Sequence, residues 1–587
     1  MATTGILRSR RSAAQLHAIA GVEREIRATD PSAGRKYLRD FHDAYRSYQS
    51  VLTSAQVRDA VARAGIVLVG DYHALPNSQR YMASLLRDPE LYHRPVVVGV
   101  ETIFSRDQHI LDEWWRREIG EDELRQRIRF DLDWGYDWGP FYEVLSAARE
   151  QGFPIYGLDC MPREDMRKIA ARDRHAADKI VEISRRHPEA LVLALFGESH
   201  LAPQHLPALV AKRLVEINSS CTGGSNRKLL TVLQNVDALY WHAAGEASER
   251  IEAVSISPDV FCVFNATPLE KYENYRLCLD RWGRDDKSAP DLGPTFYNLI
   301  GGLVRFLGIN QYSLHNSTQP RLLVDVMPEV YSRGSNALLR RLLSRKGFTS
   351  DARTSLLDRV RERGSLYLAP LNTIYVSEFR MTSAAEDATR FLHQACRGLP
   401  CLSGTGRGLL NRSLAKRAHH KKQPSVLSLE DAFYLAVFEH ALAFFGSRVL
   451  HPARPAFHDT DLAEMYDLTR EDLEQQTALR FPDAVEALDL LTRLRDFNHR
   501  DEGREDGPGS DVEHFGDVDC LSWAVTFTGH KYEYVTEQLG YLAGNDLYDA
   551  YVRGRLTPAA VRKLFLAHID EPGAARGAYF QLITRVR

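Results

Sequence analysis

Four short runs of apolar residues, separated by longer helix-like stretches, organise the first half of the chain. Each run is apolar throughout, with no alternation between apolar and polar positions. Such runs are typical of strands that are buried on both faces of a mainly parallel sheet. The predicted strands cover residues 66–70, 95–100, 154–158 and 191–196.

Segments with helical spacing of apolar residues lie between and after these runs. Residues 12–64 also look helical, and Asn77 or Ser78 is a candidate N-cap for the helix after the first strand. Strand and helix in repeated alternation predict an α/β fold, with a mainly parallel sheet flanked by helices. The helices are predicted at 77–87, 106–117, 140–151, 163–186 and 203–215, and segments 237–244 and 260–264 are expected to close the domain.

The pattern changes after the polar stretch 281–294, which is the best candidate for a linker. We therefore predict an N-terminal helical segment (1–60), an α/β domain (61–280) and a mostly helical C-terminal domain (295–587) of unknown role. In the last part, helices are expected at 296–306, 335–343, 384–396, 429–445, 483–495, 534–542 and 558–568, and a mobile loop at 496–519.

Composition narrows the class of protein. The chain has 587 residues, 44% hydrophobic and 26% charged, with a net charge of −3, which is typical of a soluble globular protein without a general attraction to nucleic acid or membranes. The N-terminus lacks the apolar core of a secretion signal, and the seven cysteines lack CxxC spacing. We expect a cytoplasmic protein with no nucleic-acid or membrane partner; whether it forms a homodimer is left open.

Ionisable residues follow all four predicted strands. Tyr72 and His73 come after the first, Glu101 after the second, Asp159 after the third and His200 after the fourth. Both histidines stand in the spacing Gly-x-x-His, in which glycine permits a sharp turn off the strand. Because ligands of open α/β sheets bind beyond the carboxyl ends of the strands, we expect these side chains to converge.

Two imidazoles and a carboxylate have two chemical uses. His73, Glu101 and His200 are suited to binding a divalent metal such as zinc, manganese or iron. The same three residues could act as general base and acid without a metal. Structural roles compete with both: a strand-end histidine is often a surface residue, Glu101 could form an ion pair with Arg172, and Asp159 could be a helix cap.

Aromatic residues gather in a second group, Trp114, Trp115, Trp134, Tyr136 and Trp138. Two interpretations stay open for them. They could pack the first helix of the domain into the core, or line a flat apolar ligand pocket.

These motifs together resemble a known family. The segments GDYH (70–73), VETIF (100–104), IYGLD (155–159) and GESH (197–200), with Gln108, Leu111, Asp112 and residues 134–140, are similar to the ChaN-like, haem-binding uptake branch of the Tiki superfamily. Its relatives include Tiki metalloproteases, TraB proteins and erythromycin esterases. The resemblance covers about residues 60–215, and the helical half lies outside it.

The resemblance implies a function for the strand-end residues. Haem would be held by Tyr72, His73 or His200 and packed against Trp134, or a metal ion would be held by His73, Glu101 and His200. The alternative is a metal-dependent hydrolase that uses the same three residues on a small-molecule or peptide ligand, and a second alternative is a non-catalytic scaffold. Haem or metal binding ranks first because the motifs match the ChaN branch most closely. ChaN-type uptake proteins are exported lipoproteins, and no cysteine precedes Cys160 here.

Overall fold

The chain divides into two compact units. In the computed structural model, residues 21–290 form one unit, called here the α/β unit, and residues 1–20 with 291–587 form the other, called the helical unit. The structure describes residues 2–30, 36–89, 93–161, 169–220, 227–244, 251–283, 290–309, 327–332, 336–345, 347–397, 429–500, 529–569 and 571–586. The predicted loop at 496–519 lies largely outside these residues, and so do residues 284–289 of the predicted linker at 281–294.

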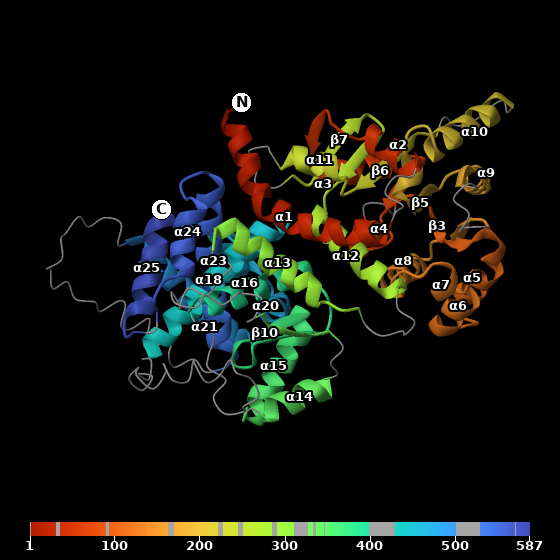
Figure 1. Cartoon of the computed structure of the whole chain (residues 1–587). Helices are drawn as coiled ribbons and strands as arrows, with labels where there is room; N and C mark the ends of the chain where they lie inside the picture. Colours follow the sequence, from red (N-terminus) through yellow and green to blue (C-terminus); the bar gives the residue numbers. More distant parts are fainter. Residues whose placement is uncertain are drawn as a thin grey trace. The chain divides into compact units, whose positions relative to one another are not determined.

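An eight-stranded sheet forms the centre of the α/β unit (Figure 1), with the order β1-β7-β8-β6-β2-β5-β3-β4. Every two neighbouring strands in the series β8-β6-β2-β5-β3-β4 are parallel, and β7 is antiparallel to both β8 and β1. The strands are β1 (Ser50–Leu52), β2 (Ile66–Asp71), β3 (Val96–Phe104), β4 (Ile155–Asp159), β5 (Leu191–Gly197), β6 (Leu229–Gln234), β7 (Ala253–Ser257) and β8 (Val260–Val263). The predicted fold class and all four predicted strands are confirmed.

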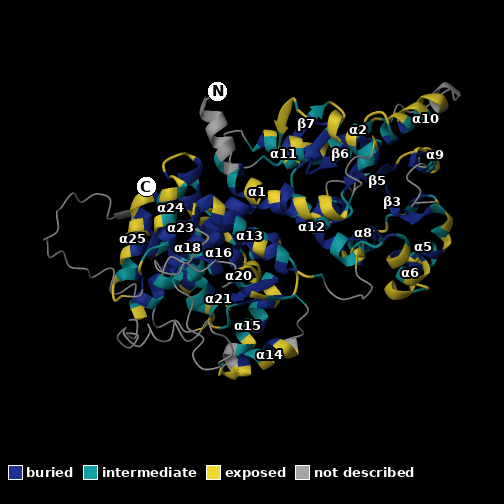
Figure 2. Cartoon of the chain, viewed as in Figure 1, coloured by how far each residue is buried: buried dark blue, intermediate teal, exposed yellow. Residues whose placement is uncertain are grey.

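Both faces of the sheet are covered, which explains why the strands are apolar throughout. Along β2, Val67 and Val69 pack into one hydrophobic cluster, whereas Ile66 and Leu68 pack into the other. The central strands are accordingly coloured as buried in Figure 2. Helices α3 (Ser54–Arg63), α4 (Pro76–Leu86), α5 (Gln108–Trp115) and α8 (Trp138–Glu150) cover the first face, and α2 (Lys36–Ala44), α9 (Ile169–Arg186), α10 (Leu206–Ser220) and α11 (Asp237–Ala243) cover the second.

Two local predictions are wrong. Residues 12–64 are not helical throughout, because the edge strand β1 interrupts them and pairs with β7. The N-cap of α4 is Leu75, with a proline at the first helical positions, and neither Asn77 nor Ser78. Their side chains are engaged elsewhere: the Asn77 amide donates to the carbonyl of Asn265, and the Ser78 hydroxyl accepts from the backbone of Tyr72.

Part of the long helix α1 and three further helices complete this unit. They are the part of α1 (Ala2–Thr29) after Ala20, the short helices α6 (Glu121–Arg127) and α7 (Phe130–Asp133), and α12 (Pro268–Trp282). Thr267 caps α12 by accepting a hydrogen bond from the backbone of Glu270. This cap fixes the start of a helix that contributes to the candidate site.

The second unit is mostly helical, as predicted, and also holds a small sheet. Strand β11 (Thr373–Val376) lies between β10 (Ser365–Leu368), to which it is antiparallel, and β9 (Glu329–Tyr331), to which it is parallel. The helices are α13 (Gly293–Leu307), α14 (Asn336–Arg345), α15 (Ser350–Arg363), α16 (Met381–Arg397), α18 (Leu429–Leu450), α19 (Asp459–Glu464), α20 (Arg470–Thr477), α21 (Phe481–Arg500), α23 (His530–Val552), α24 (Pro558–Phe565) and α25 (Ala574–Val586).

Helix α18 is the central helix of this unit. By length and composition it is apolar enough to cross a membrane, and 78% of its apolar window is buried inside the protein. It packs against α16, α23 and α25. Buried phenylalanines such as Phe433, Phe438 and Phe445 line it, as expected of a core helix.

The contact between α18 and α23 depends on Gly540 and Gly544 of α23, and Gly544 gives a first testable prediction. A Cβ atom on Gly544 would overlap the carbonyl oxygen of Ala441 and lie 2.8 Å from Cβ of Phe444. We expect Gly544→Ala to destabilise the helical unit by about 1–3 kcal/mol despite the better helix propensity of alanine, because the two backbones must move apart. Urea denaturation followed by circular dichroism measures the change.

Gly577 in α25 is the matched control, since no atom lies within 4 Å of the Cβ position. Gly577→Ala is expected to be neutral or to stabilise by up to about 1 kcal/mol. Equal unfolding midpoints for the two variants would contradict the close packing of α18 and α23.

Candidate functional site

His73 is oriented by a carboxylate two residues earlier in the chain. Asp71 is the last residue of β2, and one of its oxygens lies 2.7 Å from Nδ1 of His73. The Gln79 amide donates to the other Asp71 oxygen, which fixes the carboxylate. Nε2 of His73 therefore faces Glu101, whose Oε2 is 3.7 Å away. Burial raises the pKa of Asp71, and the neighbouring His73 acts in the opposite direction.

Glu101 lies within a strand and not after its end. Strand β3 continues to Phe104, which pairs with Asp159 after a register shift that follows Val100. The carboxylate is 3% exposed and accepts hydrogen bonds from the backbone of Gly197 and from Arg172, each at 2.6 Å. A buried carboxylate needs such donors to stay ionised.

Arg172 joins two buried carboxylates, Glu101 within β3 and Asp159 at the end of β4. Its Nη2 lies 2.6 Å from Glu101, and its Nε lies 2.8 Å from Oδ1 of Asp159. Asp159 is completely buried and also accepts from the backbone of Cys160 at 2.8 Å. The nearby carboxylates raise the pKa of Arg172 against the effect of burial. The ion pair between Glu101 and Arg172, which the sequence left as one alternative, is present in the structure.

His200 repeats the arrangement of His73 on the other side of Glu101. It lies in a short 3-10 helix after β5, and its Nδ1 is hydrogen-bonded to Asp173 of α9. Its Nε2 lies 3.8 Å from Oε1 of Glu101. Tyr37 of α2 donates to the second oxygen of Asp173 at 2.9 Å, so this pair is fixed in the same way as the first.

The structure thus brings His73, Glu101 and His200 together, with each imidazole held at Nδ1 by an aspartate and presenting Nε2 to one carboxylate. Gly197 allows this approach. A Cβ atom there would lie 3.0 Å from Nε2 of His73 and 3.1 Å from Oε2 of Glu101. The glycine of this second Gly-x-x-His motif is needed because of the crowding around it, since its φ is an ordinary −52° and no unusual turn requires it.

A cavity of about 390 Å³ opens beside His73. Its position shows which predicted site residues can contact a ligand: Tyr72 and His73 line it, whereas Glu101, His200 and Trp134 are not among the lining residues. The His73 side chain is 20% exposed, compared with 5% for His200. The described lining residues are Glu23, Ile26, Arg27, Asp30, Tyr37, Leu38, His42, Asp71, Tyr72, His73, Ala74, Tyr136, Gly197, Glu198, Ser199, Asp237, Lys271, Tyr272 and Tyr275.

A buried cation marks the other polar part of the cavity. Lys271 of α12 lies 3.0 Å from Glu198 and 3.7 Å from Asp237, and its ammonium lies 4.5 Å from the ring centroid of Tyr72. Burial lowers the pKa of this ammonium, but Glu198 and Asp237 outweigh that effect and keep it above the usual value. Lys271 lies outside every motif that the sequence offered.

The aromatic group of the sequence divides between the core and the site. Trp114 and Trp138 are buried in the hydrophobic cluster on one face of the sheet, so core packing describes them. Trp134 also belongs to that cluster, and its ring centroid is 4.5 Å from that of His73. Tyr136 alone of the group lines the cavity.

No set of three histidine, cysteine or acidic side chains in the described part of the chain has the geometry of a metal site. Within the cluster, the two Glu101 oxygens accept hydrogen bonds from Arg172 and Gly197, and the two imidazole Nε2 atoms lie 3.7 and 3.8 Å from this carboxylate. The described residues therefore add no support to the divalent-metal hypothesis.

Glu270, which precedes Lys271 in α12, gives a prediction about pH. Burial raises the pKa of its carboxyl from 4.5 to about 7. The folded unit therefore holds this proton more tightly than the unfolded chain, so stability is fully present below pH 4.5 and is lost as the pH rises to about 7. Glu270→Gln should be about 3 kcal/mol more stable than wild type at pH 8, and no more stable at pH 4. Urea denaturation at the two pH values tests this.

Glu150→Gln is the control, because that carboxylate is 59% exposed. It should leave the pH dependence of the unfolding midpoint unchanged. A Glu270→Gln variant with the same pH dependence as wild type would show that the Glu270 carboxyl is not protonated in the folded unit.

Comparison with known proteins gives one family match. Residues 57–182 match the family model described as haem-binding uptake, Tiki superfamily, ChaN. No curated protein matches the chain.

Two solved structures are similar. One is a complex described as cofacial heme binding to ChaN of Campylobacter jejuni, with 15% identity, a TM-score of 0.25, and coverage of 33% of this chain and 89% of that chain. The other is the type III effector HopBA1, with 14% identity, a TM-score of 0.25, and coverage of 37% and 96%.

Proposed function

We propose that the α/β unit, whose residues 57–182 match the haem-binding uptake family model, binds haem in the cavity beside His73. The observation that carries this proposal is the orientation of His73. Its Nδ1 is hydrogen-bonded to Asp71 at 2.7 Å, and its side chain lines the cavity. Histidines that bind a metal through one ring nitrogen usually donate the other to a carboxylate or carbonyl, and histidine is a common axial ligand of haem iron.

The lining residues fit a flat aromatic ligand with acidic side groups. Tyr72, Tyr136 and Tyr275 supply aromatic surface. Arg27, which is 73% exposed, is the cation of the lining that could face a carboxylate of the ligand, since Lys271 is paired with Glu198 and Asp237. Bound haem would supply an iron centre, and the residues of the chain would hold it, orient His73 and shield one side from water.

Hemin titration of the full-length protein tests the proposal. We expect a saturable Soret band that differs from that of free hemin, with one haem bound per chain. A titration in which the spectrum stays that of free hemin would overturn it.

The paired imidazoles favour hydrolysis as a second candidate. In this case His73 would accept a proton from a water molecule through Nε2, while Asp71 stabilises the imidazolium. Positioned general bases of this kind contribute about 10²–10⁴-fold to a rate. A panel of nitrophenyl esters, assayed with wild type and with His73→Gln, distinguishes the two candidates. Turnover that depends on His73 in a protein without Soret binding would select hydrolysis.

A further inference from the structure

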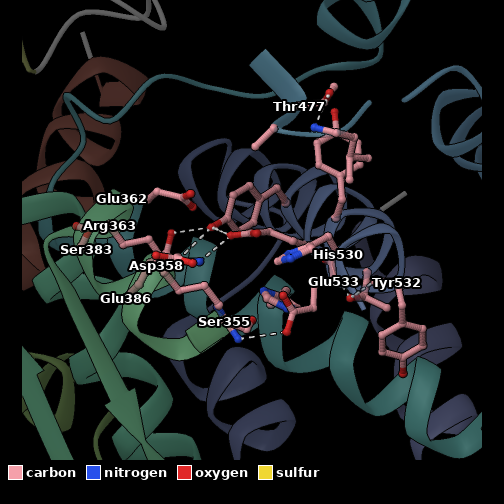
Figure 3. Close-up of a pocket in the computed structure, with 18 of the residues that line it drawn as sticks. Ser355, Asp358, Glu362, Arg363, Ser383, Glu386, Thr477, His530, Tyr532 and Glu533 are labelled. Carbon is pink, nitrogen blue, oxygen red and sulfur yellow. Dashed lines mark hydrogen bonds and ion pairs between the residues drawn. The ribbon is translucent and has the colours of Figure 1, made fainter. Parts of the chain in front are cut away.

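A second cavity, of about 670 Å³, lies inside the helical unit (Figure 3). Helices α15, α16, α18 and α23 contribute most of its wall. Hydroxyls, guanidinium groups and carboxylates line it, from Ser355 and Asp358 on α15 to Glu533 on α23. The volume is within the range of small-molecule sites, about 300–1,000 Å³.

The charges around this cavity balance. Five carboxylates and four guanidinium groups line it. A fifth guanidinium group, that of Arg390, is not part of the lining but lies 3.4 Å from Oε2 of Glu386. The described residues therefore give the cavity no net charge that would select an anion or a cation. The lining carboxylates are Asp358, Glu362, Glu386, Glu533 and Glu537, and the lining arginines are Arg359, Arg361, Arg363 and Arg454.

Ion pairs within the wall hold most of these groups. Arg363 is hydrogen-bonded to Glu386, and it donates to Oε1 of Glu537 at 2.6 Å. Arg359 donates to Oε1 of Glu533 at 3.3 Å. An ionic ligand would have to compete with such pairs, and separating a buried pair is costly. A neutral ligand can instead add hydrogen bonds to groups that stay paired.

Arg454 shows that the cavity needs an acceptor. Its side chain is 7% exposed, and its guanidinium carbon lies 4.0 and 4.7 Å from the ring centroids of Phe444 and Tyr541. It forms an ion pair through Nη1, which lies 2.5 Å from Oε1 of Glu386. In the part of the chain that the structure describes, its Nε and Nη2 have no acceptor. A guanidinium group has five N–H donors, and buried donors need partners.

His440 supplies a second donor to the same cavity. Burial and the nearby Arg390 lower its pKa to about 3, so its imidazole is neutral. Its Nδ1 lies 2.9 Å from Nη2 of Arg390, which can only donate. The imidazole proton is therefore on Nε2, and no described residue accepts from that nitrogen.

Acceptors lie in the same wall. Arg363 and the Tyr541 hydroxyl both contact Oε1 of Glu537, and Arg359 contacts Oε1 of Glu533. The Oε2 atoms of both glutamates have no donor among the described residues. The side chains of Glu537 and Glu533 are 24% and 41% exposed, so a molecule in the cavity can reach them.

We propose that this cavity binds a neutral, polyhydroxylated small molecule, a sugar or a cyclic polyol, through Arg454 and Glu537. A hydroxyl group both accepts and donates, so a molecule with several hydroxyls can use the guanidinium N–H groups and the carboxylate oxygens together. An anion would use the donors alone and be repelled by the carboxylates, and a cation would meet the reverse. Tyr532 and Tyr534 also line the cavity and offer aromatic surface to the C–H groups of such a ligand.

Saturation-transfer difference NMR of the full-length protein tests this inference, with D-glucose, D-ribose, trehalose and myo-inositol as probes. We expect saturable transfer to at least one of the four with wild type. Arg454→Lys keeps the charge beside Glu386 and removes the guanidinium donors, so it should weaken this binding at least tenfold. The matched control Arg353→Lys, on α15 but outside the lining, should stay within twofold.

A second pair of variants decides the question if Arg454→Lys does not fold. Ser355 lines the cavity, so Ser355→Trp should fill it and abolish binding while every charged group stays in place. Thr354→Trp is its control, because the neighbouring Thr354 is exposed and outside the lining. It should bind the probe like wild type.

Several results would overturn the inference. If none of the four probes binds saturably to wild type, the cavity is not a site for polyhydroxylated molecules. Equal losses in Ser355→Trp and Thr354→Trp would place the binding elsewhere on the protein. Inorganic phosphate or methylammonium that displaces the probe at equal concentration would assign the site to ionic ligands instead. Since these experiments use no haem, their failure leaves the proposed function of the α/β unit unaffected.

Discussion

Replacing Arg172 with alanine is expected to lower the free energy of unfolding of the α/β unit by about 3–5 kcal/mol, the largest loss that we predict for a single side chain. Arg172 is 6% exposed, and it is the shared cation of Glu101 and Asp159, which are 3% and 0% exposed. Its removal leaves two buried carboxylates without their cation, and burying an unpaired charge is far more costly than losing an exposed pair.

The tryptophans of the chain make this change measurable within the intact protein. Six of the seven, Trp114, Trp115, Trp134, Trp138, Trp241 and Trp282, lie in residues 21–290, so urea denaturation followed by tryptophan fluorescence reports mainly on the α/β unit. Arg213→Ala is the control, because its pair with Asp178 is about half exposed and should contribute less than about 1 kcal/mol. Equal effects of the two substitutions would mean that the Arg172 cluster is hydrated.

Replacing His73 with alanine is expected to weaken hemin binding at least tenfold, or ~1.4 kcal/mol, with the unfolding midpoint of the α/β unit almost unchanged. The side chain lines the cavity and is partly exposed, so its loss removes a ligand contact and little core packing. The Soret titration of the variant measures the first effect, and tryptophan-detected unfolding the second.

His109→Ala is the matched control, since that histidine is exposed on α5. It should bind hemin like wild type. If the His73→Ala variant binds hemin with unchanged affinity, another residue of the lining must contact the haem. A large drop in stability would instead show that His73 has a structural role through its bond to Asp71.

The elements that the sequence predicts best are those whose burial is uniform. The run Ile66–Val69 is apolar because helices cover both faces of the sheet, and β5 alternates between the same two hydrophobic clusters. The edge strand β1 could not be predicted from the sequence, for the opposite reason. It has three residues, it is partly exposed, and it is defined by pairing with β7, some two hundred residues later in the chain.

The site shows the same division between local and distant information. His73 and His200 follow from one rule about strand ends, and Asp71 could have been added because it precedes His73 by two residues, whereas Glu101 lies within its strand. Tyr37 and Lys271 carry no such signal. They reach the site from α2 and α12, and only the packing of those helices shows that Tyr37 supports His200 and that Lys271 lies over Tyr72.

Burial also decides between roles that the sequence cannot separate. A glutamate in an apolar strand, as Glu101 is in the sequence, is equally compatible with a role as metal ligand, general base or ion-paired residue. The structure shows that Glu101 accepts from Arg172 and Gly197 and has no surface on the cavity. Glu101 is thus an ion-paired residue behind the cavity, whereas His73 lines it.

The order of the sheet has a practical consequence for anyone who dissects this protein. A fragment cut at the limits of the family match, residues 57–182, would keep β2, β3 and β4 but lose β5 and β6, the two neighbours of β2. Strand β2 would then have no partner on either side, and β3 would keep only β4. Open, apolar strand edges of this kind pair with other molecules, so such a fragment would aggregate, and it would also lack His200. The smallest piece that retains every strand of the sheet extends from β1 to β8, and Lys271 requires α12 as well.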